Sequence, residues 1–370
     1  MDRRIKILYL LMAGSKVGGA EEQYRLLIEA LDKERFEPVA VLPEEGELRE
    51  MLRRAGAETF TVKTPMWRKG RSIIARYIAA HKLVKLAEGL GIDLAHSEFR
   101  MTPYLIALKR KLGIPIVSHV RTDIRPDQIE KYKLAEADAV IAISCRLKRR
   151  LLEGGIPPEK VRVVYDGVDL GLFSPEAGGV LREEFRPRGE VLIGLVGRIE
   201  PFKRQLDFLR AAEMVIKSGR SASFFLIGAV QSKRYFREIE RFIEERGLEG
   251  DVILTGGRRD MPRVMASLDV LVTLSGGSVM LEAMACGKPV VSATSLKPEE
   301  SRIVLHGETG LLVPRDEIEK LAEAICKLVD DPDLRRRMGE AGRRRAEELF
   351  GRERMARETE AIYEELIRRR

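Results

Sequence analysis

The chain has 370 residues, a length that suits two domains better than one. Apolar residues make up 44% and charged residues 34%, so the chain can bury a core, and no apolar run is long enough to span a bilayer. The net charge of +8 favours an anionic partner, which can be a nucleotide, a nucleic acid or a lipid surface. The four histidines lack metal-ligand spacing, and the three well-separated cysteines are typical of reduced thiols in a cytoplasmic protein.

The first half of the chain predicts alternating strands and helices. It begins with a charged segment that leads into a strand and has no small-residue cleavage site, so we expect no secretory signal. Such alternation is typical of a parallel sheet covered by helices. We expect strands at 5–12, 36–42, 58–62, 92–96, 114–120, 137–144 and 161–165, and helices at 21–31, 47–55, 72–89, 103–112 and 145–154.

A glycine-rich loop joins the first strand to the first helix. It contains Gly14, Gly18 and Gly19, whose spacing does not match the G-x-G-x-x-G fingerprint of dinucleotide-binding proteins, so NAD binding is not indicated. These glycines either allow a ligand to approach the backbone or only turn the chain.

His119 and Arg121 fall at the carboxyl end of the strand expected at 114–120. Open α/β sheets bind their ligands at that edge. A single histidine is more often a structural residue, but the polar cluster His119-Val120-Arg121-Thr122-Asp123 favours a site here.

A basic segment surrounds the helix expected at 72–89. It is either a solvated face or a patch for an anionic membrane surface. Its cations are Lys63, Arg68, Lys69, Arg71, Arg76, Lys82 and Lys85.

A polar stretch rich in glycine, proline and charge runs from about 176 to 190, and we place the domain linker there. A second αβ series follows, with a strand, turn and helix from Val191. Further strands are expected at 224–228, 252–255 and 268–274, in a short segment that ends at Val291, and at 311–313, and helices at 233–246, 261–267, 279–286, 317–329, 333–349 and 352–370.

Two turns in this second half suit a diphosphate, one rich in glycine and the other basic. Gly276, Gly277 and Ser278 join a buried strand to a helix, whose free N–H groups bind phosphate readily, and Glu282 one turn later is close enough to reach a ribose. Many α/β proteins use such glycines for packing only. Arg198 and Lys203 bracket Pro201 at a helix start and form either a diphosphate clamp or a solvated basic turn.

Several motifs, in order along nearly the whole chain, resemble family 4 of the retaining glycosyltransferases. The motifs are Gly18-Gly19-Ala20-Glu21, Asp166-Gly167-Val168-Asp169 with Phe173 and Pro175, Gly197-Arg198 with Lys203, the segment from Leu281 to Val291, and the segment from Gly307 to Pro314. The second motif has aspartate where the family has asparagine.

The resemblance implies a GT-B fold, in which two Rossmann-like domains face each other across a cleft. Residues 1–180, joined by the last helix at 352–370, would form the acceptor domain, and residues 190–351 the nucleotide-sugar domain. Arg198 and Lys203 would neutralise the donor diphosphate, Glu282 would bind the ribose, and Gly18 and Gly19 would approach the phosphates or the sugar. No metal or cofactor is expected, and the reaction would retain the anomeric configuration.

The chain departs from the family pattern around the sugar. Leu274 stands where the family has a glutamate, Arg121 aligns with the usual histidine, and His119 lies two residues earlier. These positions are expected to touch the sugar and not the nucleotide.

From the motifs and the composition together we predict a cytoplasmic glycosyltransferase that associates with the inner face of an anionic membrane. It would move a sugar from a nucleoside-diphosphate sugar to a glycan or lipid-linked acceptor. No nucleic-acid partner is expected. The alternatives are a nucleotide-sugar epimerase of the same fold and a non-catalytic polyanion-binding protein.

Overall fold

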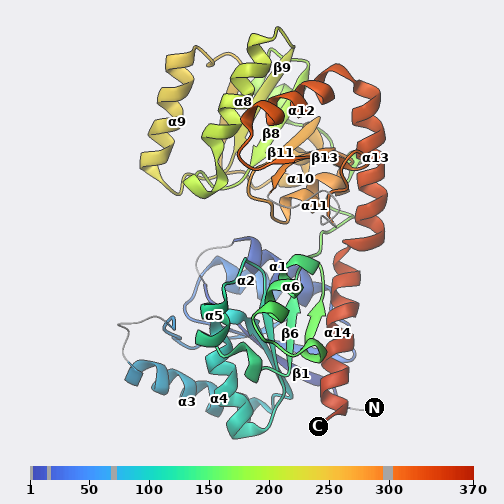
Figure 1. Ribbon diagram of the computed structural model, residues 1–370. Helices are drawn as coiled ribbons and strands as arrows, with labels where there is room; N and C mark the ends of the chain where they lie inside the picture. Colours follow the sequence, from blue (N-terminus) through green and yellow to red (C-terminus); the bar gives the residue numbers. More distant parts are fainter. Residues whose placement is uncertain (1–2, 15–17, 68–72, 295–302) are drawn as a thin grey trace. The chain divides into compact units, whose positions relative to one another are not determined.

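The computed structural model describes residues 3–14, 18–67, 73–294 and 303–370, which form two compact units (Figure 1). The first unit comprises Met1–Gly167 and Arg352–Arg370, and the second comprises Val168–Gly351. The chain thus passes between units at Gly167 and Val168, ahead of the linker expected near 176–190. That stretch folds within the second unit because Leu181 is buried and Ser267 Oγ accepts a hydrogen bond from Val180 N at 2.7 Å.

The first unit is built on a parallel sheet of seven strands in the order β3-β2-β1-β4-β5-β6-β7. Its strands are β1 (Ile5–Leu10), β2 (Phe36–Leu42), β3 (Glu58–Thr61), β4 (Leu94–Glu98), β5 (Ile116–Val120), β6 (Ala139–Ala142) and β7 (Val161–Val163). Its helices are α1 (Gly19–Ala30), α2 (Glu47–Arg54), α3 (Ile73–Leu90), α4 (Thr102–Leu112), α5 (Pro126–Lys131), α6 (Cys145–Glu153) and α14 (Arg352–Arg368), with short 3₁₀ turns at Phe99–Met101, Leu134–Glu136 and Pro158–Lys160.

Helices cover both faces of this sheet, as the period-two alternation of a buried strand requires. Leu8 and Leu10 of β1 face one core, which α3, α4 and α6 complete. Ile7 and Tyr9 face the other core, against α1, α2 and α14. The last helix of the chain is therefore part of the first unit.

The second unit has a parallel sheet of six strands in the order β10-β9-β8-β11-β12-β13. Its strands are β8 (Val191–Val196), β9 (Ala222–Ile227), β10 (Val252–Gly256), β11 (Val270–Thr273), β12 (Val290–Thr294) and β13 (Gly310–Pro314). Its helices are α7 (Leu181–Phe185), α8 (Gln205–Lys217), α9 (Lys233–Arg246), α10 (Met261–Ser267), α11 (Val279–Ala285), α12 (Ile318–Asp330) and α13 (Pro332–Leu349), with 3₁₀ turns at Pro175–Ala177 and Pro201–Lys203. None of the described helices has the length and apolar character needed to cross a membrane.

Strand order reverses once in each sheet, between β1 and β4 in the first unit and between β8 and β11 in the second. Loops that leave the carboxyl ends of such a pair diverge to opposite faces, and ligands bind in the crevice that results. The loops after β1 and β8 carry Gly18 and Arg198, and the loop after β11 carries Gly276. The topology therefore places the predicted glycine loops at the ligand-binding edges of their own sheets.

Candidate functional site

In the second unit, Lys203 is held at the carboxyl edge of the sheet. The chain leaves β8 through Gly197 and forms a 3₁₀ turn at Pro201–Lys203 before α8 begins. Lys203 Nζ lies 3.1 Å from Ser275 Oγ, at the end of β11. Burial lowers the pKa of the Lys203 ammonium, Glu200 opposes this shift, and Arg198 adds to it. A half-buried cation that has no contacting carboxylate among the described residues suits an incoming anion.

Gly197 makes room for this lysine. Its φ of +156° lies in a region that side-chain-bearing residues rarely adopt, and a Cβ at this position would lie 3.2 Å from Cδ and Cε of Lys203. Arg198, the other predicted clamp residue, is 61% exposed at its side chain and pairs with Glu200 at 3.0 Å. Lys203 is thus fixed in place, whereas Arg198 lies at the surface.

The loop between β11 and α11 has the conformation that its glycines predict. Gly276 and Gly277 have φ values of +65° and +112°, and apart from Gly277 and its two chain neighbours no described residue has a heavy atom within 4 Å of where a Cβ of Gly277 would stand. Ser278 precedes α11, and Glu282 lies half-buried in the first turn of that helix. The backbone at Gly277 therefore stands open to a ligand, beside Ser275 and Lys203.

Leu274, which stands in place of the family's glutamate, belongs to the hydrophobic core of the second unit and is 3% exposed. Its side chain packs among apolar neighbours. The loop of Ser275 to Ser278 is therefore the part of this segment that can offer polar groups to a sugar.

In the first unit, the predicted pair His119 and Arg121 is in direct contact. His119 is the last residue but one of β5, and Arg121 Nη2 lies 3.3 Å from His119 Nδ1. Arg121 also forms a buried ion pair with Asp166. Burial raises the pKa of Asp166, and the guanidinium of Arg121 opposes that shift. The segment after Asp166 is fixed by α1, because the Gln23 side chain bonds both Gly167 O, at 2.9 Å, and Gly167 N, at 2.8 Å.

Four polar side-chain atoms around this pair are buried and have no partner within the described residues. They are Tyr24 OH, Glu98 Oε2, His119 Nε2 and Arg121 Nε. Glu98 ends β4 and is paired in register with His119, and Tyr24 lies under the Arg121 guanidinium, whose Cζ is 5.1 Å from the ring centroid. Buried polar atoms are rarely left without partners in native proteins, so this cluster is suited to a ligand that offers both donors and acceptors.

Sequence reasoning missed Glu98 and Tyr24. A signal for Glu98 was present, because a carboxylate follows a buried apolar strand at the ligand-binding edge. Burial raises the pKa of Glu98 to about 7, while Arg100, 2.7 Å away, acts in the opposite direction. Tyr24 could not be distinguished from a core aromatic by its helical position.

Gly18 and Gly19 lie at the start of α1, where Gly18 N donates to Glu21 Oε2 at 3.0 Å. The residues just before them, 15–17, lie outside the described parts of the chain. Gly18 and Gly19 share the carboxyl edge of the first sheet with His119 and Arg121, whereas Arg198, Lys203, Gly276, Gly277, Ser278 and Glu282 share that edge of the second.

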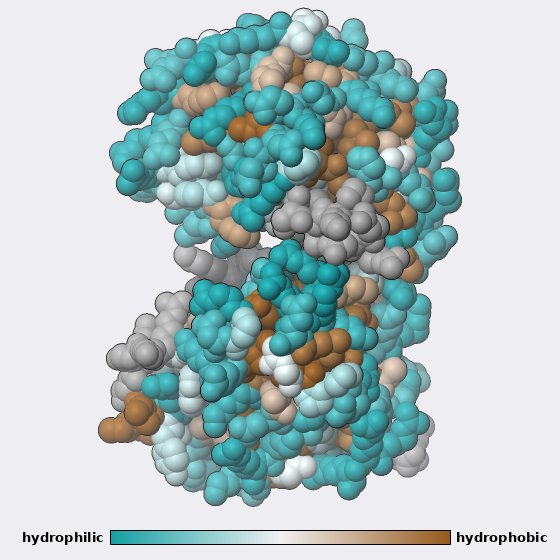
Figure 2. Space-filling model, viewed as in Figure 1, coloured by the Kyte–Doolittle hydropathy of each residue, from teal (hydrophilic) through white to brown (hydrophobic). Residues whose placement is uncertain are grey.

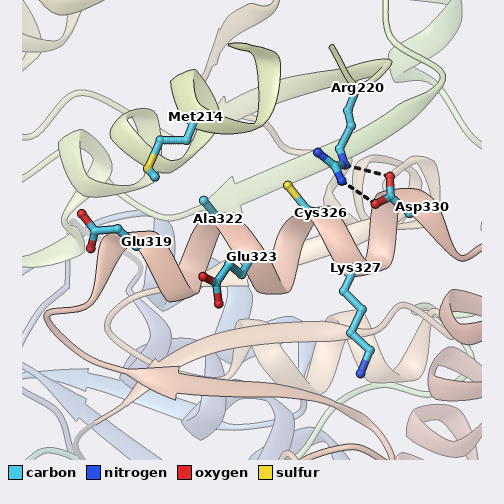
Figure 3. A pocket seen from close by; sticks show the side chains of 8 residues that line it. All are labelled: Met214, Arg220, Glu319, Ala322, Glu323, Cys326, Lys327 and Asp330. Carbon is cyan, nitrogen blue, oxygen red and sulfur yellow. Dashed lines mark hydrogen bonds and ion pairs between the residues drawn. The ribbon is translucent and has the colours of Figure 1, made fainter. Parts of the chain in front are cut away.

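Among the described residues, no group of three or more His, Cys, Asp or Glu side chains could hold a metal ion. A hollow of about 580 Å³ lies between α8 and α12 of the second unit (Figure 3). Arg220 and Asp330 close one end of it with bonds of 2.8 and 2.7 Å. It contains none of the predicted site residues. Its lining comprises Met214, Arg220, Glu319, Ala322, Glu323, Cys326, Lys327 and Asp330.

Two Rossmann-like parallel-sheet units, each with a ligand-binding edge at its switch point, are the architecture of the GT-B glycosyltransferases, and the chain has this fold. The chain belongs to family 4 of these glycosyltransferases. Residues 17–172 match the family model described as Glycosyltransferase Family 4, and residues 181–345 match Glycosyl transferases group 1. The chain is therefore a sugar transferase, and these matches do not favour an epimerase or a non-catalytic polyanion-binding protein.

Relatives of the chain are named for the transfer of different sugars. N-acetyl-alpha-D-glucosaminyl L-malate synthase of Bacillus anthracis is 24% identical over 78% of this chain and 79% of its own length. GDP-mannose-dependent alpha-mannosyltransferase of Mycobacterium tuberculosis is 27% identical over 89% of this chain and 88% of its own. Among solved structures, HepE of Anabaena in complex with UDP has a TM-score of 0.83 and 24% identity, covering 98% of this chain and all of that one. This last likeness shows the fold.

Proposed function

We propose that the protein is a retaining glycosyltransferase that uses a nucleoside-diphosphate sugar and requires no metal ion. The observation that carries the proposal is the half-buried Lys203 ammonium, positioned by Ser275 beside the open backbone of Gly277. Structures of HepE are described in complex with UDP and with UDP-glucose, and this likeness supports a nucleotide donor. Because one relative is named for GDP-mannose, the base and the sugar stay open.

In this proposal each predicted site residue of the second unit has one role. Lys203, joined by Arg198, stabilises the negative charge that develops on the departing diphosphate. The Gly276-Gly277-Ser278 loop brings backbone N–H groups to the phosphates, and Glu282 accepts hydrogen bonds from the ribose hydroxyls. Lys203 and Arg198 together would supply the charge compensation that Mg²⁺ supplies in many other nucleotide enzymes.

The first unit would orient the transferred sugar and the acceptor. His119 and Arg121 donate hydrogen bonds to hydroxyl or phosphate oxygens, and Gly18 and Gly19 let the ligand approach the backbone of α1. The acceptor hydroxyl attacks on the face that the diphosphate leaves, and a donor phosphate oxygen takes its proton. The new glycosidic bond then has the anomeric configuration of the donor.

The acceptor is a glycan or a lipid-linked molecule, and we propose that the enzyme meets it at an anionic membrane surface. Four large apolar side chains at the start of α3 are exposed, namely Ile73, Ile74, Tyr77 and Ile78, at 77, 71, 76 and 49%. Figure 2 shows an apolar patch at the edge of the first unit, where α3 begins in Figure 1. The exposed Lys82 and Lys85 follow on the same helix. Apolar side chains beside lysines are typical of surfaces that insert into anionic lipid. The predicted cations Arg68, Lys69 and Arg71 lie outside the described residues.

The test combines ligand binding with turnover. Purified protein in EDTA is screened by thermal shift against UDP-, GDP- and ADP-sugars, and the best donor is used in transfer assays with NMR analysis of the product anomer. We expect at least one donor to raise Tm, transfer to persist in EDTA, and the anomeric configuration to be retained. Lys203→Ala should lower kcat about a hundredfold.

Lys217→Ala is the matched control, because Lys217 lies at the exposed far end of α8 and pairs with Glu213. It should leave kcat unchanged. Normal turnover by Lys203→Ala would remove the clamp, and an inverted product or loss of activity in EDTA would contradict the retaining or metal-independent part of the proposal.

A further inference from the structure

A run of hydrogen bonds crosses the interior of the first unit and ends at His119. Tyr9 OH of β1 lies 3.1 Å from Tyr363 OH of α14. Tyr363 OH lies 2.5 Å from His96 Nδ1, and His96 Nε2 lies 3.2 Å from His119 Nδ1. The four side chains are at most 1% exposed. Solvent therefore does not compete for these protons.

Arg121 determines which atom donates and which accepts in each of these hydrogen bonds. A guanidinium can only donate, so the contact of 3.3 Å between Arg121 Nη2 and His119 Nδ1 requires a lone pair on that nitrogen. His119 therefore carries its proton on Nε2. His96 Nε2 faces the same lone pair and must carry a hydrogen, because two lone pairs at 3.2 Å would repel. It follows that His96 Nδ1 accepts from the Tyr363 hydroxyl.

The other end of the run follows by the same reasoning. Since the Tyr363 proton points to His96, the Tyr363 oxygen accepts from Tyr9. The His96 and His119 rings lie 10° from parallel with centroids 5.3 Å apart, and Tyr24 packs edge-on against both. Packing thus fixes the rings, while hydrogen bonds fix the tautomers.

We propose that Tyr363 and His96 are positioning residues that hold His119 as the neutral tautomer protonated at Nε2. This inference rests on the proposed function, which brings a substrate oxygen to His119. The single proton on Nε2 is buried and has no acceptor among the described residues. His119 then donates one hydrogen bond to a hydroxyl or phosphate oxygen of the substrate and does not serve as a base.

The electrostatic environment agrees with a neutral ring. Burial, with a smaller effect of Arg121, lowers the pKa of His96 to about 3. Burial, Arg121 and His96 together hold the pKa of His119 well below its usual range. The other titratable groups around the two rings are the carboxylate Glu98, the hydroxyls of Tyr9, Tyr24 and Tyr363, and Asp166, which pairs with Arg121. Burial raises the pKa of each of these five. The tyrosines therefore stay protonated and can donate.

The first experiment reads the tautomers without any substrate. The full-length protein is labelled with ¹⁵N-histidine, and ring-nitrogen shifts are recorded from about pH 5.5 to 8, the range in which an ordinary histidine titrates. We expect His96 and His119 to stay neutral with protonated Nε2 throughout this range. A His119 protonated on Nδ1, or charged at the acid end, would overturn the inference.

The second experiment removes one hydroxyl at a time. Tyr363→Phe deletes the donor to His96 Nδ1 and leaves that lone pair buried without a partner, so the His96 ring-nitrogen shifts should change. Because His96 is then held less firmly against His119, kcat should fall about fivefold with KM for the donor unchanged. Tyr9→Phe is the matched variant, since it also deletes one buried hydroxyl but leaves the donor to His96 in place. Its histidine spectrum should equal that of the wild type.

If Tyr363→Phe leaves the His96 shifts unchanged, or if Tyr9→Phe alters them equally, the proposed direction of the run is wrong. If the protein shows the expected tautomers but transfers no sugar, the proposed function is contradicted and the tautomer assignment of His96 and His119 stands.

Discussion

Arg121 and Asp166 are two departures from the family pattern that account for each other. Arg121 aligns with the family's histidine, and Asp166 replaces its asparagine. In the structure these two side chains form a buried ion pair. Either charge alone would be buried without a counter-charge, which costs several kcal/mol. The sequence displayed both departures, but their pairing across 45 positions depends on the fold.

Glu98 gives a residue-scale prediction about pH. Its pKa is about 7 in the folded chain, against an ordinary value of 4.5. Between these values the folded state holds a proton that the unfolded state has lost, so stability falls as pH rises through this range. Glu98→Gln removes this titration. We expect the variant to match the wild type near pH 5 and to exceed it by about 3 kcal/mol near pH 8.

Urea denaturation at both pH values measures this difference. Glu34→Gln serves as control because Glu34 is an exposed carboxylate of the same unit. If Glu98→Gln and Glu34→Gln show the same change between the two pH values, Glu98 does not titrate in this range.

At the scale of elements, hydrophobic patterning located nearly all the strands and helices that the structure describes. Continuous apolar runs predicted the buried parallel strands, and glycine and proline marked their ends. The sequence did not predict α5 and α7, which have six and five residues and too few turns for a periodic pattern.

The strand expected at 92–96 is instead Leu94–Glu98. Glutamate is uncommon in strands, so the pattern ended this one too early, whereas pairing of Glu98 with His119 on β5 extends it. This shift of two residues places Glu98 at the ligand-binding edge. The strand propensities of the individual residues could not predict this shift.

Helix α3 carries a prediction at this scale. Replacing Ile74 and Ile78 by Glu removes two exposed apolar side chains and adds charges that anionic lipid repels. Cosedimentation of the double variant with anionic vesicles at low salt should fall at least about tenfold relative to the wild type. Binding of the wild type should weaken with added salt.

Met214→Glu is the control, because Met214 is an apolar residue of the second unit that is 41% exposed. It should sediment with vesicles as the wild type does. Equal binding of wild type to neutral and anionic vesicles, or unchanged binding of the double variant, would leave α3 as a solvent-exposed face.

At the scale of the whole molecule, length and the two αβ series predicted two Rossmann-like units, and the sequence indicated the residues at their ligand-binding edges. The long-range contacts were beyond its reach. Tyr363 lies 267 positions from His96, and nothing in the periodicity of α14 marks one buried tyrosine as a hydrogen-bond donor. Contacts of this kind depend on tertiary packing, which gives different neighbours to residues that look alike in the sequence pattern.

The return of the chain to the first unit leads to a final prediction. Met355, Ile362 and Leu366 of α14 are buried in the core formed with α1 and β1. Glu360 also accepts a hydrogen bond of 2.7 Å from Asp32 N. Ile362→Ala should therefore destabilise the first unit by about 2–5 kcal/mol, through lost burial and the cavity it leaves.

Hydrogen exchange followed by mass spectrometry can show where this effect falls. In Ile362→Ala, peptides from β1, β2 and α1 should exchange faster, whereas peptides from β8 and β9 should keep the protection of the wild type, because the second unit has its own core. Arg357→Ala, at an exposed position of the same helix, should change neither set. Equal acceleration in β8 and β9 would mean that the two units open together, and that α14 supports the whole chain and not the first unit alone.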